Sequence, residues 1–259
     1  MTQEPNESIK RILLDILMPY YIPGLITGAA LGLLPYWYNS NTAQSHLTKS
    51  EQANLPLSID EDKAFIMVYA DGIDGRSYRL PTPTSEYFRF KQRNHTIRDY
   101  VDYTNFVTYD NKTVKGHAES LTSHLSSQES KAQLLLDFVH SHIYDKSIEE
   151  KADYVRYPLE TMVERNGDCE DLAILGAGLM KSIGLDVALV VFPREGEKAG
   201  HAGVGVNGNF SGHYFNVEGK KYFYAETTGT NWLTRPAKWK IGDLPPDFNS
   251  RPVNIYIIK

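Results

Sequence analysis

The sequence predicts an α+β protein in which a long helix packs on an antiparallel sheet. The helix is indicated by residues 169–183, where apolar side chains recur at helical spacing. The sheet is indicated by "DVALVVF" (186–192), a continuous run rich in β-branched residues that is typical of a buried strand. Further short strand patterns follow this run and are separated by turn signals: "HAGVGV", "YFNV" and "KYFYAE".

The composition excludes several classes of protein. The chain has 259 residues and a formal net charge of -5, and its longest basic run is Lys220–Lys221, so we expect no nucleic-acid partner. Cys169 is the only cysteine, which excludes an internal disulfide and a zinc site built from several thiolates. We expect no cofactor and no resident metal.

The N-terminal part of the chain contains a long apolar run. Residues 16–38 include no charged side chain, and as a helix they would span about 35 Å, enough to cross the apolar core of a bilayer. Lys10 and Arg11 precede the run, so the positive-inside rule places the N-terminus in the cytoplasm and the following domain outside. We therefore expect a single-pass membrane anchor within residues 1–45. Three prolines interrupt the run, and two alternatives stay open: a cleaved signal peptide, or an apolar segment that packs on the domain or lies on the membrane.

Residues 46–115 are expected to form a linker followed by a β-rich accessory region. The stretch 39–56 is polar and lacks apolar periodicity, as linkers do. From residue 63 to residue 109 no sustained helical period appears. Three segments there have strand-like patterns: "AFIMVYADG", "YFRFKQ" and "YTNFVTYD". The stretch "RLPTPT" separates the first of these segments from the other two.

Residues 116–259 are expected to form the main domain, which begins with two helices. Ser126 and Glu129 have the spacing of a capping box, and a row of apolar residues follows along one helix face. The stretch "YPLETMVERNG" fits a short helix with Pro158 in its first turn and Gly167 beyond its end.

The next helix carries the cysteine in its first turn. Asp168 is a good N-cap residue, and Asp171 stands three residues later, where a capping-box partner would be. Gly184 is expected to end the helix. The helix start matters because its free N–H groups and the positive end of its dipole lower a thiol's pKa, and a backbone N–H there can donate to an oxyanion.

Three acidic residues oppose this effect, because negative charge raises the pKa of a thiol. Asp168, Glu170 and Asp171 must therefore point away from the sulfur of Cys169 if it is a nucleophile. Their close spacing at a helix start favours capping over calcium binding. A histidine beside the sulfur would complete the site by forming a thiolate–imidazolium pair.

His201 is the histidine best placed for that role. It begins the strand pattern "HAGVGV", and the small residues after it leave its ring uncrowded. Glu226 follows an aromatic strand pattern, where an acid is out of character, and could accept the Nδ1 hydrogen of His201. His140 and His142 are two residues apart on a helix and face different sides, so we expect packing or surface roles for them.

The order of these motifs resembles the transglutaminase-like superfamily of papain-like cysteine hydrolases. The prokaryotic branch of that superfamily has a G-D-C-E-D segment at the start of the core helix, as this chain has at residues 167–171. The resemblance covers about residues 120–235 and is carried by four stretches: "FVHSHIYD", "RYPLETMVERNGDCEDLAILGAGLMKSIGLDVALVVF", "GHAGVGV" and "YAETT".

The resemblance implies a catalytic triad. In it Cys169 is the nucleophile, His201 the general base and acid, and Glu226 the residue that orients the imidazole, although many members carry aspartate at this last position. The implied activity is thiol-dependent acyl transfer, with hydrolysis of amide or peptide bonds in a protein or peptide substrate as the leading expectation. Three alternatives stay open: a protein-crosslinking transglutaminase, a non-catalytic membrane-anchored binding domain of the same fold, and a structural cysteine in a plain α/β domain.

Overall fold

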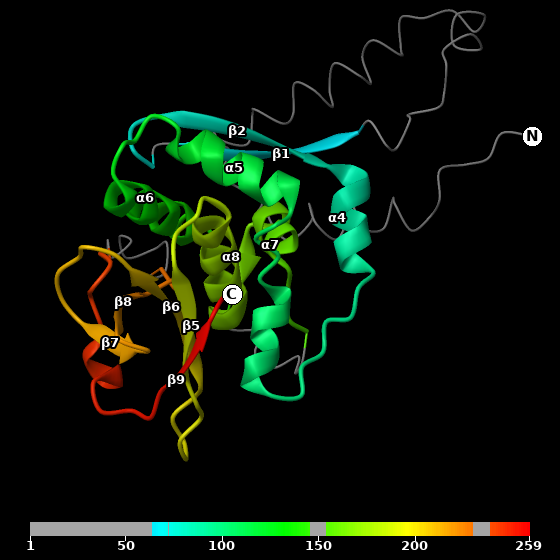
Figure 1. Cartoon of the computed structure of the whole chain (residues 1–259). Coiled ribbons are helices and arrows are strands. Elements are labelled where there is room, and N and C mark those ends of the chain that lie inside the picture. Colours follow the sequence, from blue (N-terminus) through cyan, green and yellow to red (C-terminus); the bar gives the residue numbers. More distant parts are fainter. Residues whose placement is uncertain (1–63, 72, 146–153, 230–238) are drawn as a thin grey trace, which may run out of the picture. The chain divides into compact units, whose positions relative to one another are not determined.

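A computed structural model describes residues 64–71, 73–145, 154–229 and 239–259 (Figure 1). These residues belong to one compact unit that begins at Asp60. The predicted anchor (residues 1–45) and the predicted linker (39–56) lie outside the described residues, so both stay predictions. None of the helices in the described part of the chain is long and apolar enough to cross a membrane.

The described residues form both helices and strands, and most of the helices precede the strands of the main sheet. In chain order the elements are β1 (Phe65–Asp71), β2 (Ser77–Pro83), α4 (Thr84–Lys91), the 3-10 helix η4 (Tyr100–Phe106), α5 (Lys112–Thr122), α6 (Gln128–His140), β3 (Ile143–Tyr144), α7 (Pro158–Glu164), β4 (Asn166–Gly167), α8 (Cys169–Ser182), β5 (Val187–Phe192), β6 (His201–Asn207), β7 (Tyr214–Val217), β8 (Lys220–Ala225), the 3-10 helix η6 (Pro246–Phe248) and β9 (Asn254–Ile257).

The main sheet has five strands in the order β7-β8-β6-β5-β9, and every neighbouring pair is antiparallel. The strands predicted from residue 186 onward are all present. Glu218 and Gly219 both have positive φ in the two-residue turn between β7 and β8, as a tight hairpin turn requires. The helices and this antiparallel sheet confirm the predicted α+β class.

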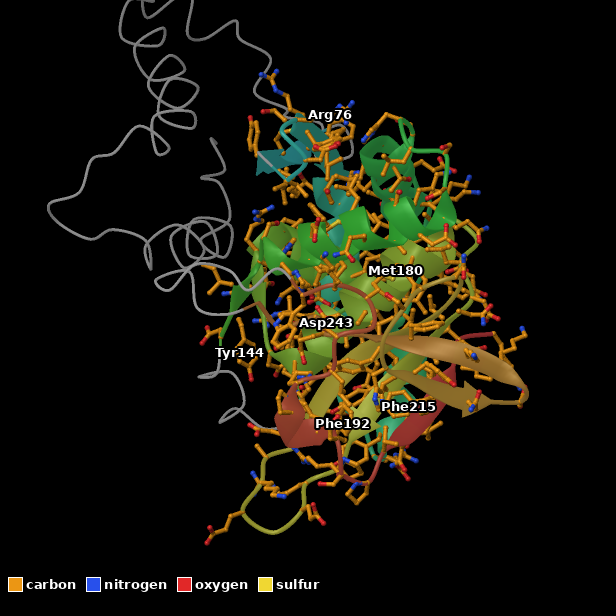
Figure 2. All side chains as sticks on the ribbon, turned by 90° about the vertical axis from the view of Figure 1, so that its left-hand side faces the viewer. Arg76, Tyr144, Met180, Phe192, Phe215 and Asp243 are labelled. Carbon is orange, nitrogen blue, oxygen red and sulfur yellow. The ribbon has the colours of Figure 1, made fainter. Side chains whose placement is uncertain are left out.

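The two faces of the sheet bury separate groups of side chains. Alternate residues of β5 point to opposite faces, so Leu189 joins the large helix-covered core while Phe192 joins a smaller cluster with Tyr224. Figure 2 shows Phe192 and Phe215 on the sheet and Met180 among the helices.

The helix α8 occupies the centre of the larger core. Its N-cap Asp168 accepts a hydrogen bond from the N–H of Asp171 at 3.2 Å, and Gly184 follows its end with a φ of 87°, a conformation that glycine adopts without strain. Both features were predicted. The helices α5, α6 and α7 pack around α8, and β5 and β6 cover its remaining face (Figure 1). Each fully buried leucine of α8 contributes roughly 1.5–3 kcal/mol.

Three expectations for the accessory region were wrong. Residues 87–92, expected as a strand, lie mostly in the helix α4, because Tyr87 and Phe90 are three residues apart and both face the core. Residues 103–110, also expected as a strand, include part of η4. In the segment 79–84, expected to separate strands, residues 79–83 belong to β2, which pairs with β1 along its whole length, and Thr84 begins α4.

Two helix ends differ slightly from the predicted positions. The N-cap of α6 is Ser127, whose Oγ accepts from the N–H of Ser130, and not Ser126. The helix α7 has Pro158 in its first turn, as predicted, but ends at Glu164, and Arg165 after it has a φ of 60°. Neither shift changes which faces are buried.

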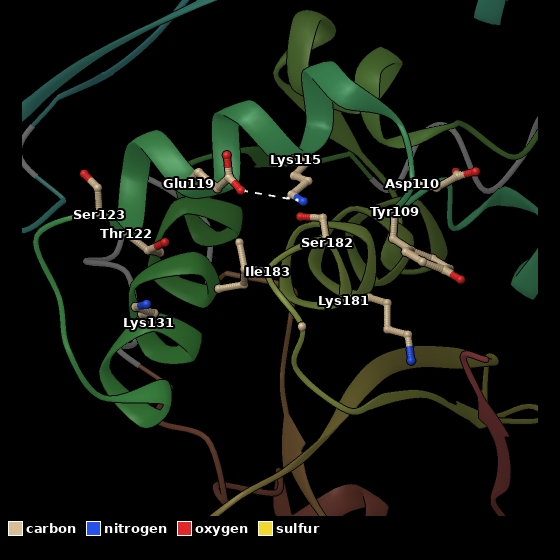
Figure 3. Close-up of a pocket in the computed structure, with 11 residues that line it drawn as sticks. Tyr109, Asp110, Lys115, Glu119, Thr122, Ser123, Lys131, Lys181, Ser182 and Ile183 are labelled. Atoms are coloured by element: carbon tan, nitrogen blue, oxygen red, sulfur yellow. Dashed lines mark ion pairs between the residues drawn. The ribbon is translucent and has the colours of Figure 1, made fainter.

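A cavity of about 700 Å³ lies at the C-terminal end of α8 (Figure 3). Lys181 and Ile183 line it together with residues of α5, among them Lys115 and Glu119, which form an ion pair at 3.8 Å. A helix of 14 residues is about 20 Å long. The cavity is therefore separated from Cys169 by the length of α8.

Candidate active site

The three residues singled out in the sequence lie at the ends of their elements. Cys169 is the first residue of α8, His201 is the first residue of β6, and Glu226 directly follows β8. The helix α8 packs against β6, and the backbone of Ala202, the second residue of β6, acts to lower the pKa of the Cys169 thiol. Glu226 is brought to the same end because Val204 of β6 pairs with Ala225 of β8.

His201 and Glu226 form a direct hydrogen-bonded pair. Nε2 of His201 lies 2.9 Å from Oε2 and 3.1 Å from Oε1 of Glu226, and both side chains are largely buried. The expected pairing of the two residues is therefore present, but the atom was predicted wrongly, since the contact is made by Nε2 and not by Nδ1. Nδ1 is left as the ring nitrogen that does not contact the carboxylate.

Glu226 is held as a carboxylate by several donors. The hydroxyl of Tyr224 donates to its Oε2 at 3.0 Å, and the N–H and Oγ1 of Thr228 donate to its Oε1 at 2.9 and 2.6 Å. Burial acts to raise the pKa of Glu226, but the hydrogen bonds from His201 and Thr228 outweigh it, and the net pKa is lowered. The ionised form of Glu226 is therefore available to stabilise a protonated imidazole.

Two further residues hold this pair in place. The ring of Phe248 stacks on the imidazole of His201 with centroids 4.7 Å apart. His140 donates from Nε2 to the backbone carbonyl of Glu226 at 2.7 Å, so this histidine supports the strand end rather than only packing in the helix. Neither contact was predicted, because each joins segments that are distant in the sequence.

The sulfur of Cys169 has an acidic neighbour. The thiol donates to Oε2 of Glu170 at 3.0 Å, and the described residues show no hydrogen bond between Cys169 and His201. Burial, followed by the negative charges of Glu170 and Asp168, raises the pKa of the Cys169 thiol well above its usual value. The resting state therefore holds a neutral thiol, and the thiolate–imidazolium pair expected from the sequence is not the state that this geometry favours.

The other two acids at the start of α8 point to different partners. Asp168 caps the helix, as predicted. Asp171 was expected to complete a capping box, but its Oδ1 and Oδ2 instead accept from the backbone N–H and Nη1 of Arg156, both at 2.7 Å. Burial, reinforced by the charges of Asp171 and Glu170, raises the pKa of Asp168.

Arg156 links the start of α8 to the helices behind it. Its Nε forms an ion pair with Glu164 of α7 at 2.8 Å, and Glu164 also pairs with Lys91 of α4 at 2.9 Å. Arg156 was not singled out in the sequence; its position directly before the "YPLETMVERNG" helix is the one local feature that could have indicated it. Within the described residues, no group of three or more His, Cys, Asp and Glu side chains is arranged to hold a metal ion.

The fold and the site define a class of α+β protein that presents a cysteine at a helix start to one end of an antiparallel sheet. Residues 91–241 match the family described as Transglutaminase-like domain, and the chain belongs to that family. No curated protein matches the chain.

Three crystal structures are also similar to this chain. One is a candidate cysteine protease from Cytophaga hutchinsonii, with 15% identity, a TM-score of 0.36, and a match over 65% of this chain and 61% of the other. A TGase has 16% identity and a TM-score of 0.34, over 66% and 46%. A candidate protease from Parabacteroides distasonis has 15% identity and a TM-score of 0.33, over 63% and 36%. The match thus spans less than two thirds of each of these proteins.

Proposed function

We propose that the protein is a thiol-dependent hydrolase of amide or peptide bonds in which Cys169, His201 and Glu226 form the triad. The observation that carries this proposal is the buried His201–Glu226 pair at the start of β6, the strand that packs against α8. A buried histidine–carboxylate pair beside a thiol at a helix start has the parts that nucleophilic acyl transfer needs.

The reaction proceeds in two halves. In the first, His201 takes the proton of the Cys169 thiol as the sulfur attacks the carbonyl carbon, and it then gives this proton to the leaving amine, so that a thioester and a free amine form. In the second, His201 takes a proton from water, the resulting hydroxide attacks the thioester, and the sulfur leaves and recovers a proton. The products are a carboxylic acid and the free thiol.

Glu226 supports this cycle by remaining ionised. Its hydrogen bonds with His201 stabilise the imidazolium that forms in each half. The raised pKa of the Cys169 thiol means that the proton moves to His201 during attack rather than beforehand. The proposed enzyme is therefore of the general-base type.

The substrate and the setting are part of the proposal. We propose a protein or peptide substrate, and a membrane anchor within residues 1–45 that places the domain outside the cytoplasm. Crosslinking with an amine in place of water, and binding without catalysis, are outcomes that the following experiment separates.

The test is carried out on the full chain, purified in detergent. A peptide library is incubated with the protein with and without a primary amine, and products are read by mass spectrometry, for the unmodified protein and for Cys169→Ala, His201→Ala and Glu226→Gln. We expect cleaved peptides that each of the three variants abolishes or reduces at least 10-fold. The matched control is His124→Ala, since His124 also pairs with an acid, Asp74 at 3.0 Å, but lies outside the triad.

Each outcome has a clear meaning. Amine-linked products in place of cleaved ones indicate a transglutaminase. Products that persist in Cys169→Ala contradict the proposal. Cleavage that is lost equally in His124→Ala shows that the losses do not arise at the triad.

A further inference from the structure

Glu170 is the acidic residue whose side chain lies against the sulfur of the proposed nucleophile. Its Oε2 accepts a hydrogen bond from Sγ of Cys169 at 3.0 Å. Cys169 is buried, whereas Glu170 is only partly buried. A substrate carbonyl carbon must come within about 3–3.5 Å of the sulfur to react. Groups that neighbour this carbonyl therefore come within reach of the Glu170 carboxylate.

The other two acids at the start of α8 already have partners within the fold. Asp168 Oδ1 accepts from the N–H of Asp171 at 3.2 Å. Asp171 accepts from the backbone N–H and Nη1 of Arg156, both at 2.7 Å. Glu170 differs from both, because no Lys, Arg or His in the described part of the chain forms an ion pair with it. Its hydrogen bond from the thiol is a weak one, since a thiol is a weak donor.

Arg251 is a second arginine near the site, and its guanidinium group is also engaged. It lies over the ring of Phe248, which stacks on His201, with 5.2 Å between the Arg251 Cζ and the ring centroid. Its Nη2 donates to two backbone carbonyls of the loop that joins β5 to β6, at 2.8 and 2.7 Å. A partly buried carboxylate without a cation is unfavourable, so a positive charge supplied by a substrate would stabilise Glu170.

We propose that Glu170 is a specificity-determining residue, which selects substrates that carry a positively charged side chain, such as that of lysine or arginine, on the acyl side of the scissile bond. This inference rests on the proposed acyl-transfer function. The acyl part becomes bonded to the sulfur, so its side chain stays near Glu170 in both halves of the reaction. The bound cation forms an ion pair with the carboxylate, which gives up its contact with the thiol.

The ion pair also helps the sulfur to react. The negative charge that stabilised the neutral thiol of Cys169 is balanced by the substrate, so the thiol gives its proton to His201 more readily. Recognition of the substrate and activation of the sulfur are thus coupled at one side chain.

The first experiment measures the charge preference of the sulfur without any hydrolysis. Cys169 is the single cysteine of the chain, so methanethiosulfonates label this site alone. The sulfur forms a mixed disulfide with the reagent, methanesulfinate leaves, and the thiol proton goes to solvent. Rates at low salt are compared for a cationic reagent, the trimethylammonioethyl derivative, and an anionic one, the sulfonatoethyl derivative.

We expect Glu170→Gln to lower the ratio of the cationic to the anionic rate by about 25-fold. This is about 5-fold for each reagent, the effect of one unit charge at about 4 Å in water. The substitution also changes the thiolate fraction, but that change affects both rates equally and cancels in the ratio.

Two variants serve as controls. Glu170→Asp keeps the charge and should retain most of the ratio. Glu119→Gln removes an exposed carboxylate of α5 that lines the cavity at the far end of α8, and it should leave the ratio unchanged. A change of less than about 2-fold in Glu170→Gln, or an equal fall in Glu119→Gln, overturns the role of Glu170. A sulfur that neither reagent labels also overturns it, because the carboxylate beside it would then be closed to substrate.

The second experiment uses two esters of matched shape. The p-nitrophenyl esters of acetyl-lysine and acetyl-norleucine differ by the ammonium group, and acylation of Cys169 releases nitrophenolate from each. We expect the unmodified protein to react with the lysine ester faster, by about 5-fold or more, and this advantage to disappear in Glu170→Gln. Equal rates for the two esters in the unmodified protein overturn the substrate preference. If neither ester acylates Cys169, the proposed function itself fails, and the ratio of labelling rates still decides whether Glu170 attracts cations.

Discussion

The thiol of Cys169 donates its hydrogen to Glu170, the next residue in the chain, with 3.0 Å between Sγ and Oε2. This contact stabilises the neutral thiol, because removal of the proton would place two negative charges side by side. The helix start, which normally favours a thiolate, is thus opposed by the side chain that follows the sulfur.

Glu170→Gln should make the sulfur more reactive at neutral pH. The substitution removes a negative charge that raises the pKa of the Cys169 thiol, so that pKa should fall and the thiolate fraction at pH 7 should rise. Each unit by which the pKa falls corresponds to a rise of about 10-fold in that fraction. The rate of alkylation by iodoacetamide, measured from pH 6 to pH 10, reports the change. Glu119→Gln, at an exposed glutamate of α5, is the control. An unchanged midpoint would show that Glu170 does not set the thiol's pKa.

Thr228→Val should shift the acid limb of the pH–rate profile. Its hydroxyl donates to Glu226, and that bond lowers the pKa of the carboxyl group. Without it the pKa of Glu226 should rise, so the ionised form should be lost at a higher pH. The acylation rate should therefore begin to fall at a higher pH on acidification.

The control for this experiment is the neighbouring threonine. Among the described residues, none forms a hydrogen bond with the buried hydroxyl of Thr227, so Thr227→Val should leave the acid limb where it is. A shift of equal size in both variants would mean that the limb reports a general disturbance of the strand end and not the state of Glu226.

Gly203→Ala should disturb the site through Tyr224. A Cβ at position 203 would lie 2.7 Å from the hydroxyl oxygen of Tyr224 and 2.9 Å from its Cζ, so the buried ring must move, and its hydrogen bond to Glu226 moves with it. We expect a loss of about 1–3 kcal/mol in the free energy of unfolding, as for overpacked cores, together with slower acylation. Denaturant unfolding measures the first and nitrophenolate release the second.

Gly116→Ala is the corresponding control in a helix. Nothing lies within 4 Å of a Cβ at this position of α5, so the substitution should stabilise the protein by up to about 1 kcal/mol. If Gly203→Ala proves as harmless as Gly116→Ala, the close approach of Tyr224 to β6 does not constrain position 203.

The buried His117 should make the fold sensitive to acid. Burial lowers the pKa of His117 to about 4, while the unfolded chain keeps a pKa of about 6.5. Because the folded pKa is depressed, the neutral ring's contribution is fully present above pH 6.5 and is lost as the pH falls toward 4. Across that window the stability should fall by about 1.4 kcal/mol per pH unit for this one group.

The measurement is denaturant unfolding at several pH values between 7 and 4. His117→Asn should reduce the slope of stability against pH, even if it lowers the stability at pH 7 through loss of the contact between Nε2 and Thr82 Oγ1 at 3.0 Å. The control is His124→Asn, at a residue that is more exposed. Parallel slopes in the unmodified protein and His117→Asn would contradict the prediction.

The sequence predicts well what is determined locally. The start of α8 at Asp168 and its end before Gly184 follow from capping chemistry and from glycine's tolerance of positive φ, and both are found. The strands β5 to β8 follow from runs of β-branched and aromatic residues, whereas β9 was not predicted. The proximity of His201 and Glu226 could be anticipated because antiparallel neighbours bring the start of one strand to the end of the other.

Features that depend on distant packing could not be predicted in this way. Phe248 stacks on His201 although the two residues are 47 positions apart in the sequence, and no local pattern indicates this contact. The aromatic residues of α4 resemble a strand because aromatic side chains favour strands, yet their spacing of three puts Tyr87 and Phe90 on one buried helix face. The three acidic residues around Cys169 were expected to raise the pKa of its thiol. Only the structure shows that Glu170 is the one whose side chain contacts the sulfur.

The pairing of β9 with β5 extends the described fold beyond the region that matches the family. The matched family region ends at residue 241, whereas β9 begins at Asn254 and covers the outer edge of β5. The region begins at Lys91, so it also omits β1, β2 and nearly all of α4. A fragment cut at those borders would leave β5 as a bare hydrophobic edge, which invites pairing between copies. The region that matches the family is therefore shorter than the compact unit, which extends from Asp60 to Lys259.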